Sequence, residues 1–354
     1  MDDMIISGDG DPVCRIYFRT SPDGLAALVR GCGPVFIVYD NNVASFASSV
    51  ASMTGAVSSF GTDVSEEGKT LDTVAGICSW LLQSGADRNA LLLAVGGGIL
   101  TDMAGFAAAI YKRGIGVAYI PTTLLSQVDA SVGGKTGVNF HQYKNILGVV
   151  RQPLFTYICI PTLRTLPYPH ILEGAAEMIK TFIIRDNGDN YRKAVSVFSD
   201  IASCGGSPDA VKRNLPLLEE LVREAVRVKA DIVAQDQFEG GLRRKLNLGH
   251  TFAHAIEWCS HRISHGQAVS MGMVLAARLS EKLSICSPGL AGRLSADLER
   301  CGLDTVSPFP VSELSSAMVK DKKSENGKVF FVLIRDIGDT EIVPLSVENV
   351  VNLL

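Results

Sequence analysis

The stretch Ala90-Leu-Leu-Leu-Ala-Val95-Gly96-Gly97-Gly98 decides the fold class of this chain. An unbroken apolar run of this length is typical of a strand that is buried on both faces in a parallel sheet. The glycines that follow let the backbone turn tightly into a helix, whose first N–H groups can bind an anion such as a pyrophosphate. They lack the Gly-x-Gly-x-x-Gly spacing of a dinucleotide fingerprint, so a plain strand-to-helix turn is an equal alternative.

Other apolar runs repeat this pattern along the first half of the chain. Further strands are expected at residues 34–40, 56–60, 116–120 and 156–160, with intervening helices at residues 43–53, 70–83 and 99–111. Strands that alternate with helices predict a doubly wound α/β domain with a parallel, Rossmann-like sheet. We place this domain at residues 1–165 and expect its ligands at the carboxyl ends of the strands.

The second half of the chain changes character, because helical patterns dominate from Leu172 onward. The break between the halves falls near residues 161–169. We therefore expect a C-terminal domain of all-α class at residues 166–354. Two apolar runs near the end, at residues 329–334 and 341–344, indicate a late hairpin.

Bulk composition limits the classes of function. The chain has 354 residues, which suits two domains, and a net charge of −4, which does not suggest a nucleic-acid partner. Its 8 cysteines are scattered without a Cys-x-x-Cys pair, so we expect neither a disulfide framework nor a zinc knuckle. The N-terminus lacks a signal peptide's apolar core, and no apolar run reaches membrane-spanning length. We expect a cytoplasmic protein with a small-molecule substrate and neither nucleic acid nor membrane as a partner.

Histidines cluster in one part of the second half. Of the 6 in the chain, His250 and His254 lie four residues apart in an apolar run, residues 246–258, that predicts a helix. Both rings would lie on one face of that helix. His265 opens the next apolar run, residues 268–283, and a helical hairpin could return it to His250. Three nitrogen ligands would suit a metal such as zinc, whereas two core histidines and one at a helix start are the alternative.

Polar residues elsewhere are compatible with an anion site. Glu66 and Lys69 follow an expected strand, where a carboxylate could hold ribose hydroxyls or face solvent at a helix start. A loop rich in glycine and hydroxyl groups, residues 121–139, lacks the spacing of a phosphate loop, which argues against a nucleotide triphosphatase. Four residues in or after this loop could still hold an anion: Asp129, Lys135, Lys144 and Asn145.

Glu177 and Lys180 stand at the head of an apolar helix. They are three residues apart, so they share one face. Charges among apolar residues are costly unless they are paired or bound to a metal. An ordinary ion pair on an exposed helix is the alternative.

Taken in order, these motifs resemble those of the 3-dehydroquinate synthases, a family of sugar-phosphate cyclases. The resemblance runs from about Asp40 to Lys323 and so covers nearly the whole chain. The matching segments are Gly96-Gly-Gly-x-x-x-Asp102, Arg113-Gly, residues 121–136, Lys144-Asn145-x-x-Gly, Thr165-Leu-Pro, Glu177-x-x-Lys180, Lys229-Ala, Gly241-Leu-Arg243, residues 246–254 and His265-Gly.

The resemblance implies a dehydroquinate synthase-like fold. In that fold an N-terminal NAD-binding α/β domain precedes a helical metal- and substrate-binding domain, and the active site lies between them. It also implies two cofactors, NAD and one divalent metal ion, zinc or cobalt. We further expect a homodimer.

The same resemblance implies roles for individual residues. The family's metal ligands match Glu177, His250 and His265, whereas His254 matches a histidine beside the phosphate end of the substrate. Positions that match cofactor contacts are Asp40, Asn42, Glu66, Lys69, Gly97, Gly98, Asp102, Thr122, Thr123, Lys135, Lys144, Thr162 and Thr165. Positions that match catalytic or substrate-binding residues are Arg113, Asp129, Lys135, Asn145, Lys180, Lys229, Arg243, Asn247, His254 and Lys322.

The family's reaction explains this choice of residues. The implied substrate, 3-deoxy-D-arabino-heptulosonate 7-phosphate, carries a carboxylate at one end and a phosphate at the other, and lysines and arginines neutralise both. NAD oxidises a secondary alcohol, phosphate is eliminated, the hydride returns, and an intramolecular aldol closes the ring of 3-dehydroquinate. NAD is regenerated in each turnover, so the net reaction is that of a phosphorus–oxygen lyase in the shikimate pathway.

Three alternatives stay open. Related cyclases, the 2-deoxy-scyllo-inosose and valiolone-type synthases, act on sugar phosphates such as glucose 6-phosphate and sedoheptulose 7-phosphate. A metal- and NAD-dependent alcohol dehydrogenase would not need the lysines and the arginine that match substrate contacts. A binding protein without activity would have lost a ligand or a substrate cation, and none is lost. Departures from the family pattern at Tyr143, His170 and Thr181 bear on substrate choice.

Overall fold

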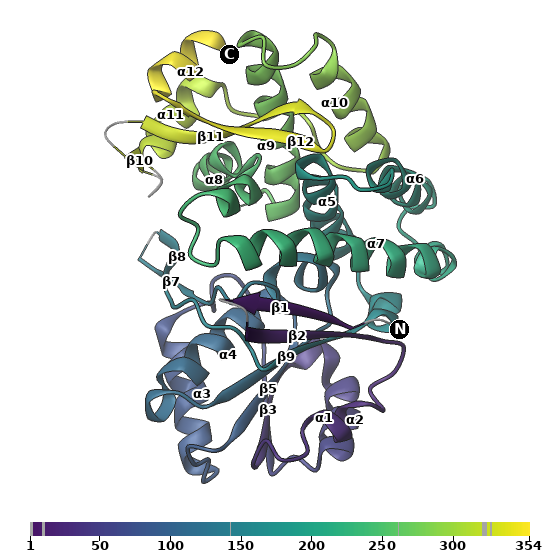
Figure 1. Ribbon diagram of the computed structural model, residues 1–354, viewed down its shortest axis with the longest axis vertical. Helices are drawn as coiled ribbons and strands as arrows, with labels where there is room; N and C mark the ends of the chain where they lie inside the picture. The colour runs from purple at the N-terminus through teal and green to yellow at the C-terminus, as the bar shows by residue number, and fades with distance from the viewer. Residues whose placement is uncertain (1–2, 9–10, 142, 261, 321–323, 326–327) are drawn as a thin grey trace. The chain divides into compact units, whose positions relative to one another are not determined.

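The apolar run that decides the fold forms β5 (Leu91–Gly96), which is buried along its whole length in the computed structural model. The structure describes residues 3–8, 11–141, 143–260, 262–320, 324–325 and 328–354. β5 lies in a seven-stranded sheet of order β1-β2-β9-β6-β5-β3-β4 (Figure 1). It pairs in parallel with β3 (Val35–Asp40) and β6 (Gly116–Pro121). The predicted parallel α/β sheet is confirmed.

The outer strands extend this sheet in both directions. β4 (Ser58–Thr62) and β9 (Phe155–Cys159) continue the parallel arrangement on the two sides, as predicted. Two strands were not predicted, β1 (Met4–Gly8) and β2 (Asp11–Arg19). β2 pairs in parallel with β9, and β1 pairs antiparallel with β2 at the edge. Burial alternates along residues 14–18 of β2, so this strand lacks the unbroken apolar run that marks the inner ones.

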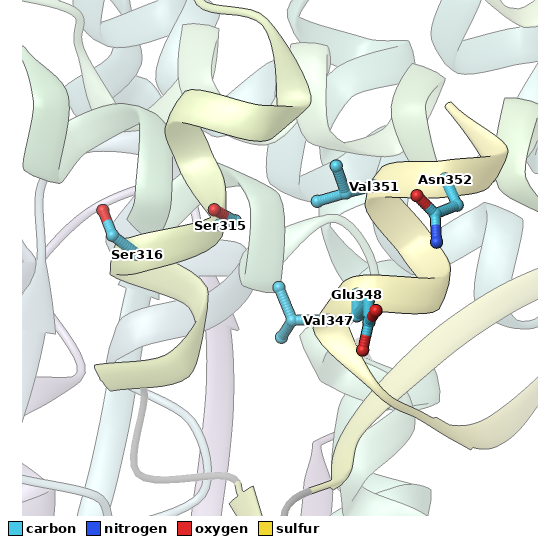
Figure 2. Close-up of a pocket in the computed structure, with 6 residues that line it drawn as sticks. All are labelled: Ser315, Ser316, Val347, Glu348, Val351 and Asn352. Carbon is cyan, nitrogen blue, oxygen red and sulfur yellow. The ribbon is translucent and has the colours of Figure 1, made fainter.

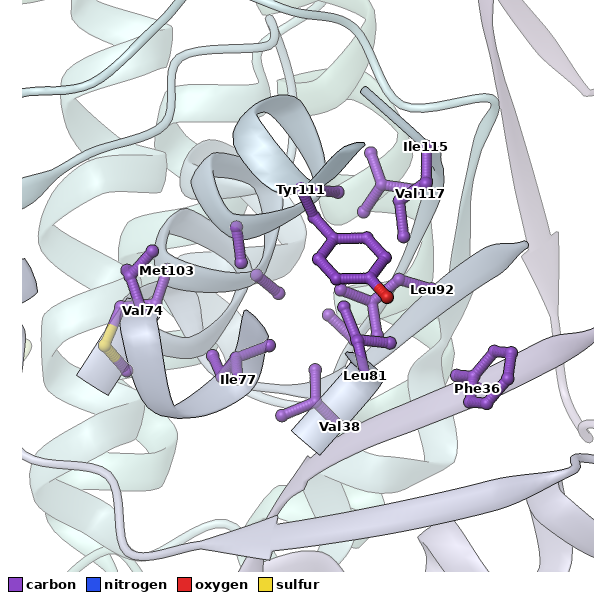
Figure 3. Packing of buried hydrophobic residues seen from close by; sticks show 14 of the residues in the cluster. Phe36, Val38, Val74, Ile77, Leu81, Leu92, Met103, Tyr111, Ile115 and Val117 are labelled. Carbon is purple, nitrogen blue, oxygen red and sulfur yellow. The ribbon is translucent and has the colours of Figure 1, made fainter. Parts of the chain in front are cut away.

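Helices cover both faces of the inner strands. On one face, α3 (Leu71–Gln83) and α4 (Gly98–Ile110) pack over Phe36 and Val38 of β3 (Figure 3). On the other, α1 (Leu25–Leu28) and α2 (Ala44–Thr54) pack over Val35 and Ile37. Successive side chains of a strand point to opposite faces, so two covered faces require apolar residues at every position.

Short elements connect the strands at the edge where β3, β5, β6 and β9 end. They are the turns η1 (Asn41–Val43), η3 (Ser126–Ala130) and η4 (Ile160–Thr165) and the small hairpin β7 (Val138–Phe140) with β8 (Tyr143–Leu147), whereas the turn η2 (Tyr111–Arg113) leads from α4 into the start of β6 at the opposite edge. By its contacts the chain divides into two units, Met1–Leu166 and Pro167–Leu354. These connecting elements all belong to the first unit.

The second unit is mainly helical. Its helices are α5 (Tyr168–Ile184), α6 (Asn190–Ser203), α7 (Pro208–Gln235), α8 (His250–Cys259), α9 (His265–Lys282), α10 (Leu290–Arg300), α11 (Val311–Lys320) and α12 (Val347–Leu353). α9 packs against α5, α8 and α10 and is buried through most of its length. Within the described residues, none of these helices combines the length and the apolarity needed to cross a membrane.

A small sheet accompanies these helices. The predicted hairpin is present as β11 (Lys328–Asp336) and β12 (Asp339–Leu345), with the short β10 (Ser324–Glu325) on its other side. β11 packs against α9, and the backbone N–H of Ile334 donates a hydrogen bond of 2.9 Å to the hydroxyl of Ser280 on that helix. The all-α class predicted for this half is therefore wrong for this small sheet, and the other regular elements of the unit are helical.

One predicted helix begins later than expected. Residues 246–258 were predicted as a continuous helix, but α8 starts at His250, and a separate turn, η5 (Leu242–Asn247), precedes it. The break is at Gly249, whose φ of 77° is left-handed and favours glycine. An apolar pattern cannot reveal such a break, because apolar residues are buried on both sides of it, Leu248 before and Phe252 after.

Glycines let three helices of this unit approach each other backbone to backbone. A Cβ atom on Gly272 of α9 would lie 2.2 Å from the carbonyl oxygen of Gly249, just before α8. One on Gly249 would lie 2.9 Å from the amide nitrogen of Met273. One on Gly266, at the start of α9, would lie 2.5 Å from Cα of Glu173 on α5. Side chains at the starts of α8 and α9 are thereby held close to α5.

We expect Gly272→Ala to destabilise the protein by about 1–3 kcal/mol, because the added methyl group would collide with the Gly249 carbonyl. Gly292→Ala is the matched control, since Gly292 is also helical but has nothing within 4 Å of an added Cβ. That variant should gain about 0.5–1 kcal/mol from the helical preference of alanine. Urea unfolding followed by circular dichroism compares the two, and equal stabilities would contradict the close approach of α8 and α9.

Candidate active site

Polar and glycine residues gather at the carboxyl ends of three neighbouring strands in the N-terminal unit. Asp40 ends β3, Gly97 and Gly98 follow β5, and Thr122 follows β6. A Cβ on Gly98 would lie 2.8 Å from that of Ala130, so packing alone requires a residue without a side chain there. α4 begins at Gly98, which directs the N-terminus of that helix and its N–H groups toward this edge.

A pocket of about 470 Å³ opens in the same unit. Three of the predicted cofactor residues line it, Asn42, Thr162 and Thr165. Asp40 Oδ1 accepts hydrogen bonds of 2.9 Å from the backbone and the side-chain nitrogen of Asn42, which orients that side chain. The pocket is also lined by Thr20, Ser21 and Pro22, which directly follow β2. These three residues were not identified from the sequence as pocket-lining, because β2 itself was not predicted.

Lys69 is the centre of a second group in this unit. Its side chain is buried, and Nζ lies 2.6 Å from Oδ2 of Asp102 and 2.6 Å from Oδ1 of Asn145. Asn145 has a left-handed φ of 51°, a conformation that asparagine adopts more readily than most residues. The structure therefore brings together residues that the resemblance assigns to the cofactor, Lys69 and Asp102, and one that it assigns to the substrate, Asn145.

Asn139 extends this group to Glu66. Its Nδ2 donates a hydrogen bond of 2.8 Å to Oε1 of Glu66, and its Oδ1 accepts one of 2.9 Å from the backbone of Asn145. A continuous chain of hydrogen bonds thus runs from Glu66 through Asn139 and Asn145 to Lys69. Asn139 carried no predicted role, because no spacing in the sequence links it to residues so distant along the chain.

The remaining predicted residues of this unit lie on separate segments. Asp129 is in η3, Lys144 is on β8, and Lys135 forms an isolated bridge with Val150. Thr123 Oγ1 accepts a hydrogen bond of 3.2 Å from the backbone of Ser126. Arg113 ends η2 with a left-handed φ of 68°. Their predicted roles stay predictions.

Glu177 of α5 is the centre of the site in the C-terminal unit. Its side chain is fully buried, and its two carboxylate oxygens have different surroundings. Oε2 accepts a hydrogen bond from Lys180, which is also buried. Oε1 has no hydrogen-bond partner in the described structure, and Nε2 of His265 and Nε2 of His250 lie 3.4 Å and 3.5 Å from it. A buried carboxylate oxygen that faces two imidazole nitrogens is typical of a cation site.

Both histidines present the same ring nitrogen to Glu177. Nδ1 of His250 lies 3.1 Å from the carbonyl oxygen of Leu248, which can only accept, so this nitrogen carries a hydrogen. Nδ1 of His265 lies 3.2 Å from Oε1 of Glu257. In the neutral rings Nε2 is then the atom with a free lone pair, as a metal ligand requires.

These three residues fit a divalent metal. Their ligand atoms all lie within 4.8 Å of one another, and no other such group of histidine, cysteine and acidic residues occurs in the part of the chain that the structure describes. Tetrahedral ligands about 2.0–2.1 Å from a zinc ion are about 3.3 Å apart, close to the separations seen here. Three protein ligands leave a position open, as in catalytic zinc sites. Glu177, His250 and His265 are the ligand set that the resemblance implies.

His254 does not belong to this group. Its ring centroid lies 5.4 Å from that of His250, one helical turn further along α8. The ring of His265 lies at a similar distance from His250, 5.5 Å, but it comes from the start of α9. Spacing along one helix therefore pairs His250 with His254, whereas the packing of α9 against α5 supplies His265.

Charge interactions shift the ionisation of this cluster. Burial alone would raise the pKa of Glu177, but Lys180 and His265 outweigh it and lower the pKa. Burial would likewise lower the pKa of His265, but the neighbouring carboxylates of Glu177 and Glu257 raise it overall. Without a metal ion the cluster therefore favours a proton on His265 beside an ionised Glu177.

Three buried cationic side chains lie on adjoining elements of this unit. Lys180 on α5, Lys229 on α7 and Arg243 in η5 are all buried, and η5 packs against both α5 and α7. Asp236 accepts hydrogen bonds from the backbone of Gly240, Gly241 and Arg243, which closes the loop before η5. Buried cations on adjoining elements favour an anionic ligand.

Asn247 and Lys322 are two further residues of this unit with a predicted role. Asn247, also in η5, donates a hydrogen bond to Oε1 of Glu239. Lys322 lies outside the described residues.

A surface pocket of about 340 Å³ between α11 and α12 is lined by Ser315, Ser316, Val347, Glu348, Val351 and Asn352 (Figure 2). None of the predicted site residues lines it.

Comparisons with known proteins show which family the chain belongs to. The family model for the 3-dehydroquinate synthase N-terminal region matches residues 60–173, and the model for the C-terminal region matches residues 174–324. A 3-dehydroquinate synthase of Acidithiobacillus ferrooxidans is 40% identical over 323 residues, which cover 88% of this chain and 85% of that protein. One from Pyrococcus abyssi is 42% identical over 82% of each chain.

Solved structures with the same fold belong to related enzymes. A 2-epi-5-epi-valiolone synthase from Streptomyces hygroscopicus, solved with NAD⁺ and Zn²⁺, has a TM-score of 0.84 and 26% identity and covers 99% of this chain and 96% of its own. A 2-deoxy-scyllo-inosose synthase, solved with carbaglucose-6-phosphate, NAD⁺ and Co²⁺, has a TM-score of 0.83 and 21% identity with 99% of both chains covered. The family models and the relatives together span most of the sequence. The chain belongs to the 3-dehydroquinate synthase family.

Proposed function

We propose that this protein is a 3-dehydroquinate synthase, a phosphorus–oxygen lyase that depends on NAD and a divalent metal. It converts 3-deoxy-D-arabino-heptulosonate 7-phosphate into 3-dehydroquinate and phosphate, a step of the shikimate pathway and so of aromatic amino acid biosynthesis. The observation that carries this proposal is the buried Glu177, whose Oε1 faces two imidazoles while Lys180 binds Oε2. Identity of about 40% to 3-dehydroquinate synthases supports it.

Sequence identity and charge disfavour the alternatives. The two solved cyclases with other substrates are 21% and 26% identical to this chain, well below the 40% of the 3-dehydroquinate synthase relative. A glycerol dehydrogenase from Sinorhizobium meliloti shares the fold at 14% identity and a TM-score of 0.64. A dehydrogenase has no need for the buried cations Lys180, Lys229 and Arg243.

The N-terminal unit binds NAD in this proposal. The glycine turn at Gly97 and Gly98 and the N-terminus of α4 receive the pyrophosphate, and Glu66 binds ribose hydroxyls. When bound, NAD supplies reversible hydride transfer at the substrate alcohol. Lys69, held by Asp102 and Asn145, would be a further contact of the cofactor. The other proposed cofactor residues are Asp40, Asn42, Thr122, Thr123, Lys135, Lys144, Thr162 and Thr165.

The C-terminal unit binds the metal and the substrate. Glu177, His250 and His265 hold the divalent ion, zinc or cobalt, which supplies Lewis-acid stabilisation of charge on a substrate oxygen. Lys229 and Arg243 neutralise the anionic ends of the substrate, and arginine can grip a carboxylate with two hydrogen bonds. The other proposed substrate residues are Lys180, Asn247, His254 and Lys322 of this unit and Arg113, Asp129, Lys135 and Asn145 of the N-terminal unit. We further propose a cytoplasmic homodimer.

The purified protein, supplied with substrate and metal, should release many equivalents of phosphate for each NAD added, because the hydride that NAD accepts is returned. Phosphate and 3-dehydroquinate should form in equal amounts, and absorbance of NADH should stay at a low steady level. Accumulation of NADH in proportion to product would assign the protein to the alcohol dehydrogenases instead. Faster turnover of glucose 6-phosphate or sedoheptulose 7-phosphate would assign it to another cyclase.

Replacing Glu177, His250 or His265 with alanine should lower bound metal sharply, because each removes one of three ligands. His254→Ala is the matched control, since it removes a neighbouring imidazole from the same helix as His250. This variant should keep its metal and lose activity. Metal content of the four purified proteins, measured by mass spectrometry, decides the ligand set, and a metal-free His254 variant beside a metal-loaded His265 variant would refute it.

Metal binding should strengthen as pH rises. The carboxylates raise the pKa of His265 from 6.5 to about 10, so at neutral pH a metal ion must displace a proton from this ring. Affinity should increase about tenfold for each pH unit between pH 6 and 8, the slope for one released proton. Calorimetry of zinc binding in buffers of different ionisation enthalpy measures that proton. The His254→Ala variant should show the same slope, and an affinity independent of pH would show that His265 is already unprotonated.

A further inference from the structure

Glu257 lies on the same face of α8 as His250 and His254. The three residues follow one another at intervals of four and three, the spacing of neighbours on one side of a helix. The sequence carried this signal, but nothing in it showed which residue Glu257 would meet. In the structure its Oε1 lies 3.2 Å from Nδ1 of His265.

The burial of Glu257 requires an explanation. Its side chain is only 5% exposed, although ionised carboxylates are costly to remove from water. Its carboxylate lies beside Nδ1 of His265, a proposed metal ligand at the start of α9. The other ring nitrogen of His265, Nε2, faces Glu177. A carboxylate at that position holds a proton on Nδ1 and raises the basicity of Nε2.

His265 needs such a partner more than His250 does. It is the first residue of α9, and its side chain is 32% exposed, compared with 14% for His250. Packing therefore restrains its ring less, and a hydrogen bond must set the ring's orientation. His250 is instead oriented by the backbone carbonyl of Leu248, which is part of the turn before α8.

The net charge of the site gives a second reason for a carboxylate beside His265. With neutral histidines, the ionised groups Glu177 and Lys180 cancel, so a divalent ion would leave two positive charges in a buried site. The carboxylate of Glu257 offsets one of them. Positive charge in a medium of low dielectric constant is costly unless such a partner is nearby.

We propose that Glu257 is a positioning residue that orients His265 toward the metal and thereby sets the affinity of the metal site. This inference rests on the proposed function, because it assumes that Glu177, His250 and His265 bind a metal. Glu257 itself contacts neither the metal nor the substrate in this proposal. It acts through the imidazole of His265.

Zinc affinity of Glu257 variants tests this proposal. Glu257→Ala should weaken zinc binding about 10- to 100-fold, the usual effect of losing a hydrogen-bond partner of a metal ligand. Glu257→Gln should weaken it severalfold, because the amide oxygen can still accept from Nδ1 but carries no charge. Competition with a chromogenic chelator measures the affinities of the full-length proteins, and nitrogen-15 spectra of the zinc-bound proteins report which ring nitrogen of His265 carries hydrogen.

Glu173 offers a matched control. Its Oε2 lies 3.2 Å from Nδ1 of His170, the same separation as in the Glu257–His265 pair, but His170 is not a proposed ligand. Glu173→Ala should leave zinc affinity unchanged. Thermal unfolding of the metal-free variants separates a loss of stability from a loss of metal affinity.

The outcomes are distinct. If the parent protein binds no zinc, the proposed metal site itself fails. If the parent binds zinc and Glu257→Ala binds it equally well, whatever its melting temperature, Glu257 has only a structural role and the proposal is overturned. Should the alanine variant fail to fold, a glutamine variant with the affinity of the parent overturns it equally. An equal loss in the Glu173 control would also overturn it, since the effect would then not depend on His265.

Discussion

The close approach of three helix backbones is the constraint on which the site in the C-terminal unit depends. Gly272 lies against the carbonyl of Gly249, and Gly266 lies against Glu173, with no room for a Cβ atom at either contact. These contacts bring the first residues of α8 and α9, His250 and His265, to the side chain of Glu177 on α5. A side chain at either position would collide with the neighbouring backbone, so glycine here allows the close approach that brings the ligands together.

Ionisable groups in both units are arranged in mutually dependent pairs. In the C-terminal unit, Lys180 and His265 keep the pKa of Glu177 low despite its burial. In the N-terminal unit, Lys69 is buried between Asp102 and Asn145. Removal of one partner would leave an uncompensated charge in a medium of low dielectric constant, which costs more than the pair contributes.

Most of the fold could be predicted, and the failures have physical causes. Inner strands such as β5 are covered on both faces, so their apolar runs stand out in the sequence. β2 alternates in burial and was missed, and with it the polar residues Thr20 and Ser21 that line the pocket of the N-terminal unit. The start of α8 was misplaced because a single glycine with positive φ interrupts an otherwise continuous apolar pattern.

For the candidate site, the sequence by itself determined which residue types are present and which of them lie on one helix face. It paired His250 with His254 and Glu177 with Lys180, because neighbours on a helix are separated by a fixed number of residues. Local spacing could not show that His265, and not His254, joins Glu177 and His250, as the family resemblance implied, and only the tertiary structure showed that Glu257 contacts His265 and that Asn139 contacts Glu66. The reason is that contacts between elements depend on packing, and no local spacing encodes which helix starts will meet.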